Sequence, residues 1–216
     1  MIHKNFLRAS RRSFSIMGFA SICLALTSLP ALAHHPFGGT TPSNALEGFL
    51  SGLGHPVIGI DHVVFVIAAG LLAAIKPKGF WIPIAFVLAS LGGTGLHLMT
   101  VNLPAPEIII SLSVVVFGLL LATKELPHVA IIAGLGAIAG IFHGYAYGEA
   151  IVGAEMTPLI AYLAGFASVQ LLISLGIWTI ARQGLNTIPT EKGLSFRFAG
   201  FTILGIGAAF VSSLVV

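Results

Sequence analysis

Long apolar runs, separated by short polar or proline- and glycine-containing turns, dominate the sequence after residue 55. Each run is close to the about 20 residues that cross the hydrocarbon core of a bilayer as an α-helix. The runs lack alternation of apolar and polar positions, and unpaired backbone groups are costly in lipid, so helices are predicted rather than the strands of a barrel. The predicted spans are residues 56–75, 80–100, 107–123, 127–145, 157–181 and 198–216.

The composition agrees with this pattern. Hydrophobic residues make up 56% of the chain and charged residues 8%, whereas an ordinary soluble domain has about 25% charged residues. A nucleic-acid binder is excluded, because ten Lys and Arg residues spread over the chain cannot build a basic face. The single cysteine excludes a disulfide scaffold. The predicted fold class is an all-α, polytopic membrane protein with about six transmembrane helices.

The N-terminal segment has the order of features found in a secretory signal peptide. Four cations precede residue 13, an apolar stretch follows at 16–29, and Ala31-Leu32-Ala33 supplies small residues for cleavage. Residues 1–33 are therefore predicted to be a cleaved leader, and residues 34–216 a single six-helix transmembrane domain. The alternative, an uncleaved first transmembrane helix, requires a longer apolar run than this one.

The distribution of charge predicts the orientation. If residue 34 and the segment 34–54 are extracytoplasmic, six crossings place the turns at 76–79, 124–126 and 182–197 in the cytoplasm. Every cation of the mature chain falls on these turns, as the positive-inside rule requires. These cations are Lys76, Lys78, Lys124, Arg182, Lys192 and Arg197. The predicted location is the cell (inner) membrane, with Tyr145, Tyr147 and Tyr162 in the outer aromatic belt.

Ionisable residues near the outer ends of three spans are the candidate functional groups. Such groups cost several kcal/mol at bilayer depth and are kept only with partners or a task. Imidazole together with carboxylate suits Ni²⁺, Co²⁺, Zn²⁺ or Cu²⁺ and suits Ca²⁺ or Mg²⁺ poorly. The alternative is that they are hydrogen-bonded core residues. The predicted metal ligands are His55, Asp61, His62, His97 and His143.

The positions of His55 and Asp61 add to this prediction. Pro56 prefers the first turn of a helix, so a break is expected at Gly54-His55, with His55 on a cap or re-entrant turn. Asp61 either binds a cation directly or fixes the tautomer of His62 as a hydrogen-bond acceptor.

Glycines mark two further segments. The fourth span carries a stripe that predicts close packing on a neighbouring helix, and this stripe either serves packing alone or brings His143 and Glu149 against the first span. Its members are Gly136, Gly140, Gly144 and Gly148. Three glycines at 92–95, just before His97, predict a kinked or unwound segment.

The outer N-terminal segment adds a candidate capture site. Cleavage after residue 33 would leave His34 and His35 beside the terminal amine, and with Glu149 these residues are candidates for a first, weaker contact with a metal ion. The alternative is an incidental histidine pair at a flexible terminus. Asn44 and Glu47 resemble a capping box that opens a short helix over 45–53 on the outer surface.

Residues 55–62, His-Pro-Val-Ile-Gly-Ile-Asp-His, followed by Gly70, resemble the HPxxGxDH signature of the HupE/UreJ family. The segment from His143 to Glu149 is similar to a second motif of the same family. The resemblance implies a secondary permease for nickel, with cobalt in some members, associated with hydrogenase and urease gene sets. It also implies that His55, Asp61 and His62 are essential, with His143 and Glu149 as further candidates. Members often carry a histidine in the penultimate span, where this chain offers Gln170 and Ser174.

Two functional hypotheses follow. The first is a permease, not an enzyme, that moves divalent Ni²⁺ or Co²⁺ into the cytoplasm, with no permanently bound cofactor. Its partners would be the metal ion and the lipid bilayer, and a homo-oligomer stays open. Because the sequence has no nucleotide-binding motif, the membrane potential or an ion gradient would drive transport. The alternative is a heme- or metal-binding membrane enzyme, or an accessory protein of hydrogenase or urease maturation.

Overall fold

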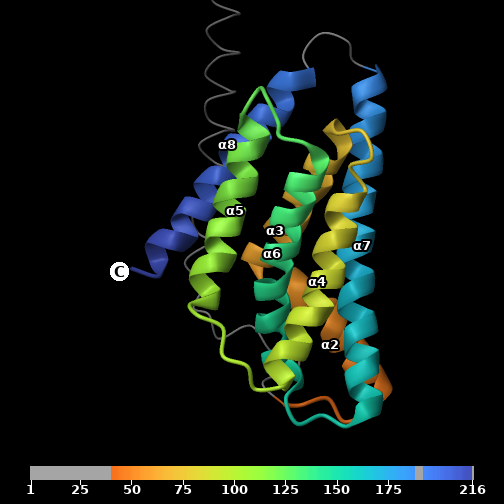
Figure 1. The fold of residues 1–216 in the computed structure, drawn as a ribbon. Coiled ribbons are helices and arrows are strands. Elements are labelled where there is room, and N and C mark those ends of the chain that lie inside the picture. The colour runs from red at the N-terminus through yellow and green to blue at the C-terminus, as the bar shows by residue number, and fades with distance from the viewer. Residues whose placement is uncertain (1–39, 188–191, 216) are drawn as a thin grey trace, which may run out of the picture. The chain divides into compact units, whose positions relative to one another are not determined.

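The computed structural model describes residues 40–187 and 192–215, and within them every regular element is a helix (Figure 1). This confirms the all-α prediction. The predicted leader at 1–33 and the predicted capture residues His34 and His35 lie outside the described residues. The helices are α2 (Ala45–Ile58), α3 (Ile60–Ile75), α4 (Trp81–Leu98), α5 (Pro106–Ala122), α6 (Val129–Gly148), the 3₁₀ turn η2 (Glu149–Ile151), α7 (Met156–Thr187) and α8 (Lys192–Ser213).

The lengths and apolar compositions of these helices are those of a multi-span membrane protein. Among the described residues, α4, α7, α8 and α6 with its η2 extension are each long and apolar enough to cross a bilayer. The bent pair α2 and α3 makes a fifth candidate if it is counted as one span. Helix α5 is apolar but has only 17 residues. Six crossings therefore stay a prediction.

Helices α4 and α6 lie side by side and run in the same direction (Figure 1). A side chain at Gly140 or Gly144 would collide with the backbone of α4, and Thr94 Oγ1 donates a 2.7 Å hydrogen bond to the carbonyl oxygen of Gly144. The glycine stripe thus serves close packing, and the helix that it packs against is α4. The same helix brings His143 against His62 of the first span, as the alternative predicted, whereas Glu149 is exposed.

The prediction of an unwound segment at residues 92–95 is wrong, and a kink there stays a prediction. Helix α4 is continuous from Trp81 to Leu98. Gly93 packs against the backbone of Ile141 on α6, so its lack of a side chain is used for helix contact rather than for a break.

Glycines also bring the other helix pairs together. Gly118 on α5 and Gly200 on α8 pack against each other's helices in an antiparallel pair. Gly52 packs against the backbone of Tyr162, and Gly70 against that of Ser174, so α2 and then α3 follow α7 in the same direction. In each of these pairs, the relative direction of the two helices agrees with six segments that cross the membrane in alternating directions. Which end faces the cytoplasm stays a prediction from the positive-inside rule.

The predicted capping box opens α2. Asn44 Oδ1 accepts a hydrogen bond from the backbone N–H of Glu47 at 3.0 Å, and Glu47 Oε2 accepts one from the N–H of Ser43 at 2.8 Å. The helix continues beyond the predicted residue 53 to Ile58 and packs on α7 instead of lying on the outer surface. Its buried face, which includes Gly48, Gly52 and His55, has helical spacing.

The break in the first span lies at Gly59 and not, as predicted, at Gly54-His55. Helices α2 and α3 meet there at an angle of 80°. Pro56 lies inside the last turn of α2, where its missing N–H removes one helical hydrogen bond, and the helix ends two residues later at Ile58. His55 is therefore a helical residue rather than part of a cap, and a re-entrant arrangement of the bent pair stays a prediction.

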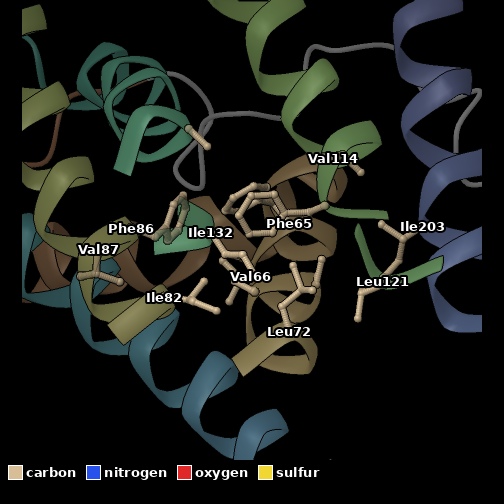
Figure 2. Close-up of a cluster of buried hydrophobic side chains, with 14 residues drawn as sticks. Phe65, Val66, Leu72, Ile82, Phe86, Val87, Val114, Leu121, Ile132 and Ile203 are labelled. Atoms are coloured by element: carbon tan, nitrogen blue, oxygen red, sulfur yellow. The ribbon is translucent and has the colours of Figure 1, made fainter. Parts of the chain in front are cut away.

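The hydrophobic core lies beside the histidines that α3 and α6 carry, His62 and His143. Figure 2 shows Phe65 and Phe86 directed toward each other, and their ring centroids are 4.7 Å apart. Phe117 adds a third ring 4.4 Å from Phe65, and Leu72 and Ile82 are fully buried in the same cluster. Large aromatic side chains in close contact fix the relative positions of α3, α4 and α5.

Candidate functional site

The break at Gly59 sets the positions of the first three candidate residues. His55 lies in the last turn of α2, while Asp61 and His62 lie in the first turn of α3. Gly59 has φ −72° and ψ 105°, which any residue can adopt. A Cβ atom there would, however, lie 2.6 Å from Cδ2 of His62. Glycine is needed at the break because the imidazole ring occupies that space.

Three imidazoles from three helices meet at this break. His55, His62 and His143 expose only 3%, 2% and 0% of their surface, and we call them the histidine cluster. The ring centroids of His62 and His143 are 4.9 Å apart, and those of His55 and His62 are 6.0 Å apart. Tyr147 packs edge-on against His55 and His62, at 5.1 and 4.7 Å.

Ser113 determines the tautomer of His143. Its Oγ donates a 2.6 Å hydrogen bond to the carbonyl of Ile110 and lies 3.0 Å from His143 Nε2. A serine hydroxyl has one proton, so toward His143 it accepts. We therefore place a proton on His143 Nε2 and, for the neutral ring, the lone pair on Nδ1. His143 Nδ1 is 2.8 Å from His62 Nδ1, so His62 donates in this pair.

Tyr162 fixes the tautomer of His55 in the same way. The Tyr162 hydroxyl donates a 2.7 Å hydrogen bond to the carbonyl of Tyr147, and it therefore accepts from His55 Nδ1 at 2.9 Å. In this assignment Nε2 is the acceptor nitrogen of His55 and of His62. Each imidazole of the cluster is thus oriented by a partner on another helix.

Asp61 does not orient the ring of His62. Its Oδ1 accepts a 2.8 Å hydrogen bond from the backbone N–H of His62 but lies 3.9 Å from His62 Nδ1, too far for a hydrogen bond. The carboxylate is favourably placed at the N-terminal end of α3, where the helix dipole is positive. With a quarter of its side chain exposed, Asp61 is more accessible than any imidazole of the histidine cluster.

The other predicted ligands lie apart from the histidine cluster. The ring centroids of His97 and Tyr145 are 4.5 Å apart, and the His97 side chain occupies the space that a Cβ atom at Gly148 would fill. Across the described residues His97 makes no hydrogen bond or ring contact with the cluster. Glu149 is exposed on η2. Nor does the described part of the chain contain any group of three or more His, Cys, Asp or Glu side chains arranged to hold one metal ion. The five-ligand set stays a prediction, and within the cluster His62 and His143 bind each other.

Tyr147, Tyr162 and Ser113 complete the site, and none of them was predicted as a site residue. Tyr147 and Tyr162 are fully buried in the bundle, so the prediction that they lie in the outer aromatic belt is wrong. The Tyr147 hydroxyl and both amide atoms of Gln170 are buried without a hydrogen-bond partner in the described residues. Tyr147 follows His143 by one helical turn, a signal that could have found it. Nothing in the sequence points to Ser113.

Comparisons with known proteins cover most of the chain. The family model described as HupE / UreJ protein matches residues 22–210. Protein HupE of Rhizobium leguminosarum bv. viciae is 36% identical over 194 residues, which cover 86% of this chain and 93% of that protein. No solved structure matches the chain.

Proposed function

This chain belongs to the HupE/UreJ family, and from that premise we propose that it is a permease for divalent transition-metal ions, with nickel as the main substrate and cobalt as the second. The ion would move into the cytoplasm. The observation that carries the proposal is the histidine cluster: three buried imidazoles converge where an apolar helix is broken. We propose no enzymatic activity.

The chemistry of the cluster supports a transition-metal substrate. Neutral imidazole is a ligand of intermediate softness that suits Ni²⁺ and Co²⁺. His55, His62 and His143 come from α2, α3 and α6, so an ion bound among them would link separate helices. The described residues pair His62 with His143, and binding would replace that hydrogen bond by bonds to the ion.

The broken helix supports a transport role. Discontinuous helices in transporters place backbone ends and polar side chains within the membrane, where they line the substrate site. Here the break leaves the C-terminal end of α2 and the carboxylate of Asp61 beside the cluster, and both are favourable for a cation. The membrane potential would contribute about 2.3 kcal/mol per charge per 100 mV to inward movement.

The packing does not favour the heme-binding alternative. A porphyrin needs a wide apolar cleft next to its axial histidine. The ring centroids of Phe65 and Phe86 instead lie 4.7 and 5.4 Å from that of His143, and the Tyr147 ring packs against His62. These side chains fill the space that a porphyrin would need.

The direct test is accumulation of ⁶³Ni²⁺ and ⁵⁷Co²⁺ in cells that express the wild type, His62→Ala or Asp61→Asn at equal membrane abundance. We expect accumulation above the vector control for the wild type and its loss in both variants. His128→Ala is the matched control, because His128 is an exposed cap at the start of α6 and should leave uptake unchanged. Accumulation by His62→Ala equal to that of the wild type would remove the proposed site.

A further inference from the structure

A cavity of about 550 Å³ lies among the ends of four helices, at the end of the bundle that carries Lys76 and Arg197. It is bounded by the last residues of α3, the turn after α5, the late part of α7 and the first turns of α8. Its volume is in the range of about 300–1,000 Å³ that small-molecule sites occupy. The lining residues are Ala74, Ile75, Leu121, Thr123, Lys124, Leu126, Leu185, Gly193, Leu194, Phe196 and Arg197.

The polar part of this lining is cationic. Among the described residues, Lys124 and Arg197 are the charged members of this lining, and none of the described lining residues is Asp or Glu. Arg197 is held in place because its Nε donates a 3.0 Å hydrogen bond to the carbonyl of Ala122. Lys76 Nζ donates to the carbonyl of Leu126 at 3.1 Å and adds a third positive charge near the cavity. A divalent metal ion would be repelled here, so this cavity does not suit the exit of the proposed substrate.

The remaining lining is apolar. Ile75, Leu121 and Leu126 come from the α3 and α5 side, and Leu185, Leu194 and Phe196 from the α7 and α8 side. A soluble anion would contact only the two cations, and the apolar surface would stay exposed to water. An amphiphile with an anionic head and a hydrocarbon chain matches both parts of the lining.

We propose that this cavity binds one anionic phospholipid, with the phosphodiester between Lys124 and Arg197 and the first part of an acyl chain along the leucine and phenylalanine side chains. The position agrees with this occupant, because helix ends of a membrane-spanning bundle lie at headgroup depth. Basic pockets between helices on the cytoplasmic side are typical places for such headgroups. The proposal depends on the membrane setting and does not depend on metal transport.

Native mass spectrometry of the full chain in detergent tests the proposal. The probes are phosphatidylglycerol, phosphatidylcholine with the same acyl chains, and inorganic phosphate. We expect one phosphatidylglycerol to be retained, phosphatidylcholine to bind at least tenfold more weakly, and phosphate not to displace the lipid. Lys124→Gln and Arg197→Gln should each weaken phosphatidylglycerol binding about fivefold.

Lys124→Gln and one further variant, Lys78→Gln, separate the effect of charge from that of folding. Lys124→Gln keeps the hydrogen bond from Arg197 to Ala122, so it remains informative if Arg197→Gln does not fold. Lys78→Gln, an exposed cation outside the lining, should leave lipid retention unchanged. Equal retention of the two lipids, displacement by inorganic phosphate, or full phosphatidylglycerol binding by Lys124→Gln would each overturn the proposal.

Discussion

Replacing Gly59 with alanine tests whether the break in the first span positions the histidine cluster. The new Cβ would lie 2.6 Å from His62 Cδ2, whereas ordinary contact begins at 3.4 Å, so the ring must move by about 0.8 Å. His62 Nδ1 is now 2.8 Å from His143 Nδ1, and a shift of that size away from His143 would take the pair beyond hydrogen-bond distance.

The ring has little room to move. His62 is 2% exposed and packs against Tyr147 and His143. Overpacking at such a position costs about 1–3 kcal/mol. We therefore expect Gly59→Ala to lower the apparent melting temperature of the protein in detergent and to reduce Ni²⁺ accumulation at least tenfold at equal abundance.

Gly92→Ala is the matched control for Gly59→Ala. An added Cβ at Gly92 meets nothing within 4 Å, and Gly92 lies inside the continuous helix α4. Alanine there should stabilise the helix by about 0.5–1 kcal/mol and leave transport unchanged. If Gly59→Ala melts and transports like Gly92→Ala, the argument that glycine makes room for His62 is refuted.

Three further predictions use other contacts. Ser113→Ala leaves the buried Nε2–H of His143 without its acceptor and should cost about 1–3 kcal/mol in thermal unfolding and lower uptake, while Ser113→Thr keeps the hydroxyl and should retain both. Equal melting temperatures and uptake for the two variants would contradict a role for this hydrogen bond. Gly144→Ala should destabilise the protein by about 1–3 kcal/mol, because the new Cβ atom would collide with the Ser90 backbone. Gly134→Ala, on the same helix, meets nothing and should not destabilise it. Similar melting temperatures for the two variants would disprove the close packing of α4 and α6. Ala105→Gly should raise stability by about 0.5–1 kcal/mol, because Ala105 has φ 45°, and an unchanged melting curve would count against strain there.

Much of the fold follows from local sequence patterns. Apolar runs of spanning length predicted the helices, and Asn44 with Glu47 predicted the start of α2, because these features depend on neighbouring residues alone. The glycine stripe predicted a close helix contact but not its partner. Choosing α4 over α3 requires knowing which helices are neighbours, and periodicity does not contain that information.

The site was predicted less completely. The sequence predicts that four histidines lie at similar depth, namely His55, His62, His97 and His143. Depth along a helix does not say toward which neighbour a side chain points. His97 faces Tyr145, while His143 meets His62 across 81 residues of sequence. Such pairings, like that of Tyr162 with His55, arise only from tertiary packing.

The position of the break shows a different limit. Pro56 is compatible both with the start of one helix and with the last turn of another. The buried face of α2 continues through His55 to Pro56, and its packing on α7 selects the second possibility. The local preference of proline allowed two positions in a helix, and the burial of this face of α2 decided between them.

The central claim is that the histidine cluster binds the transported ion, and nickel K-edge X-ray absorption tests it most directly. The purified protein would carry His34→Ala and His35→Ala, to remove the two N-terminal imidazoles, and one equivalent of Ni²⁺. We expect scattering from at least two imidazoles, and we expect its loss when His62→Ala is added. A nickel ion surrounded by oxygen ligands alone, or a spectrum unchanged by His62→Ala, would contradict it.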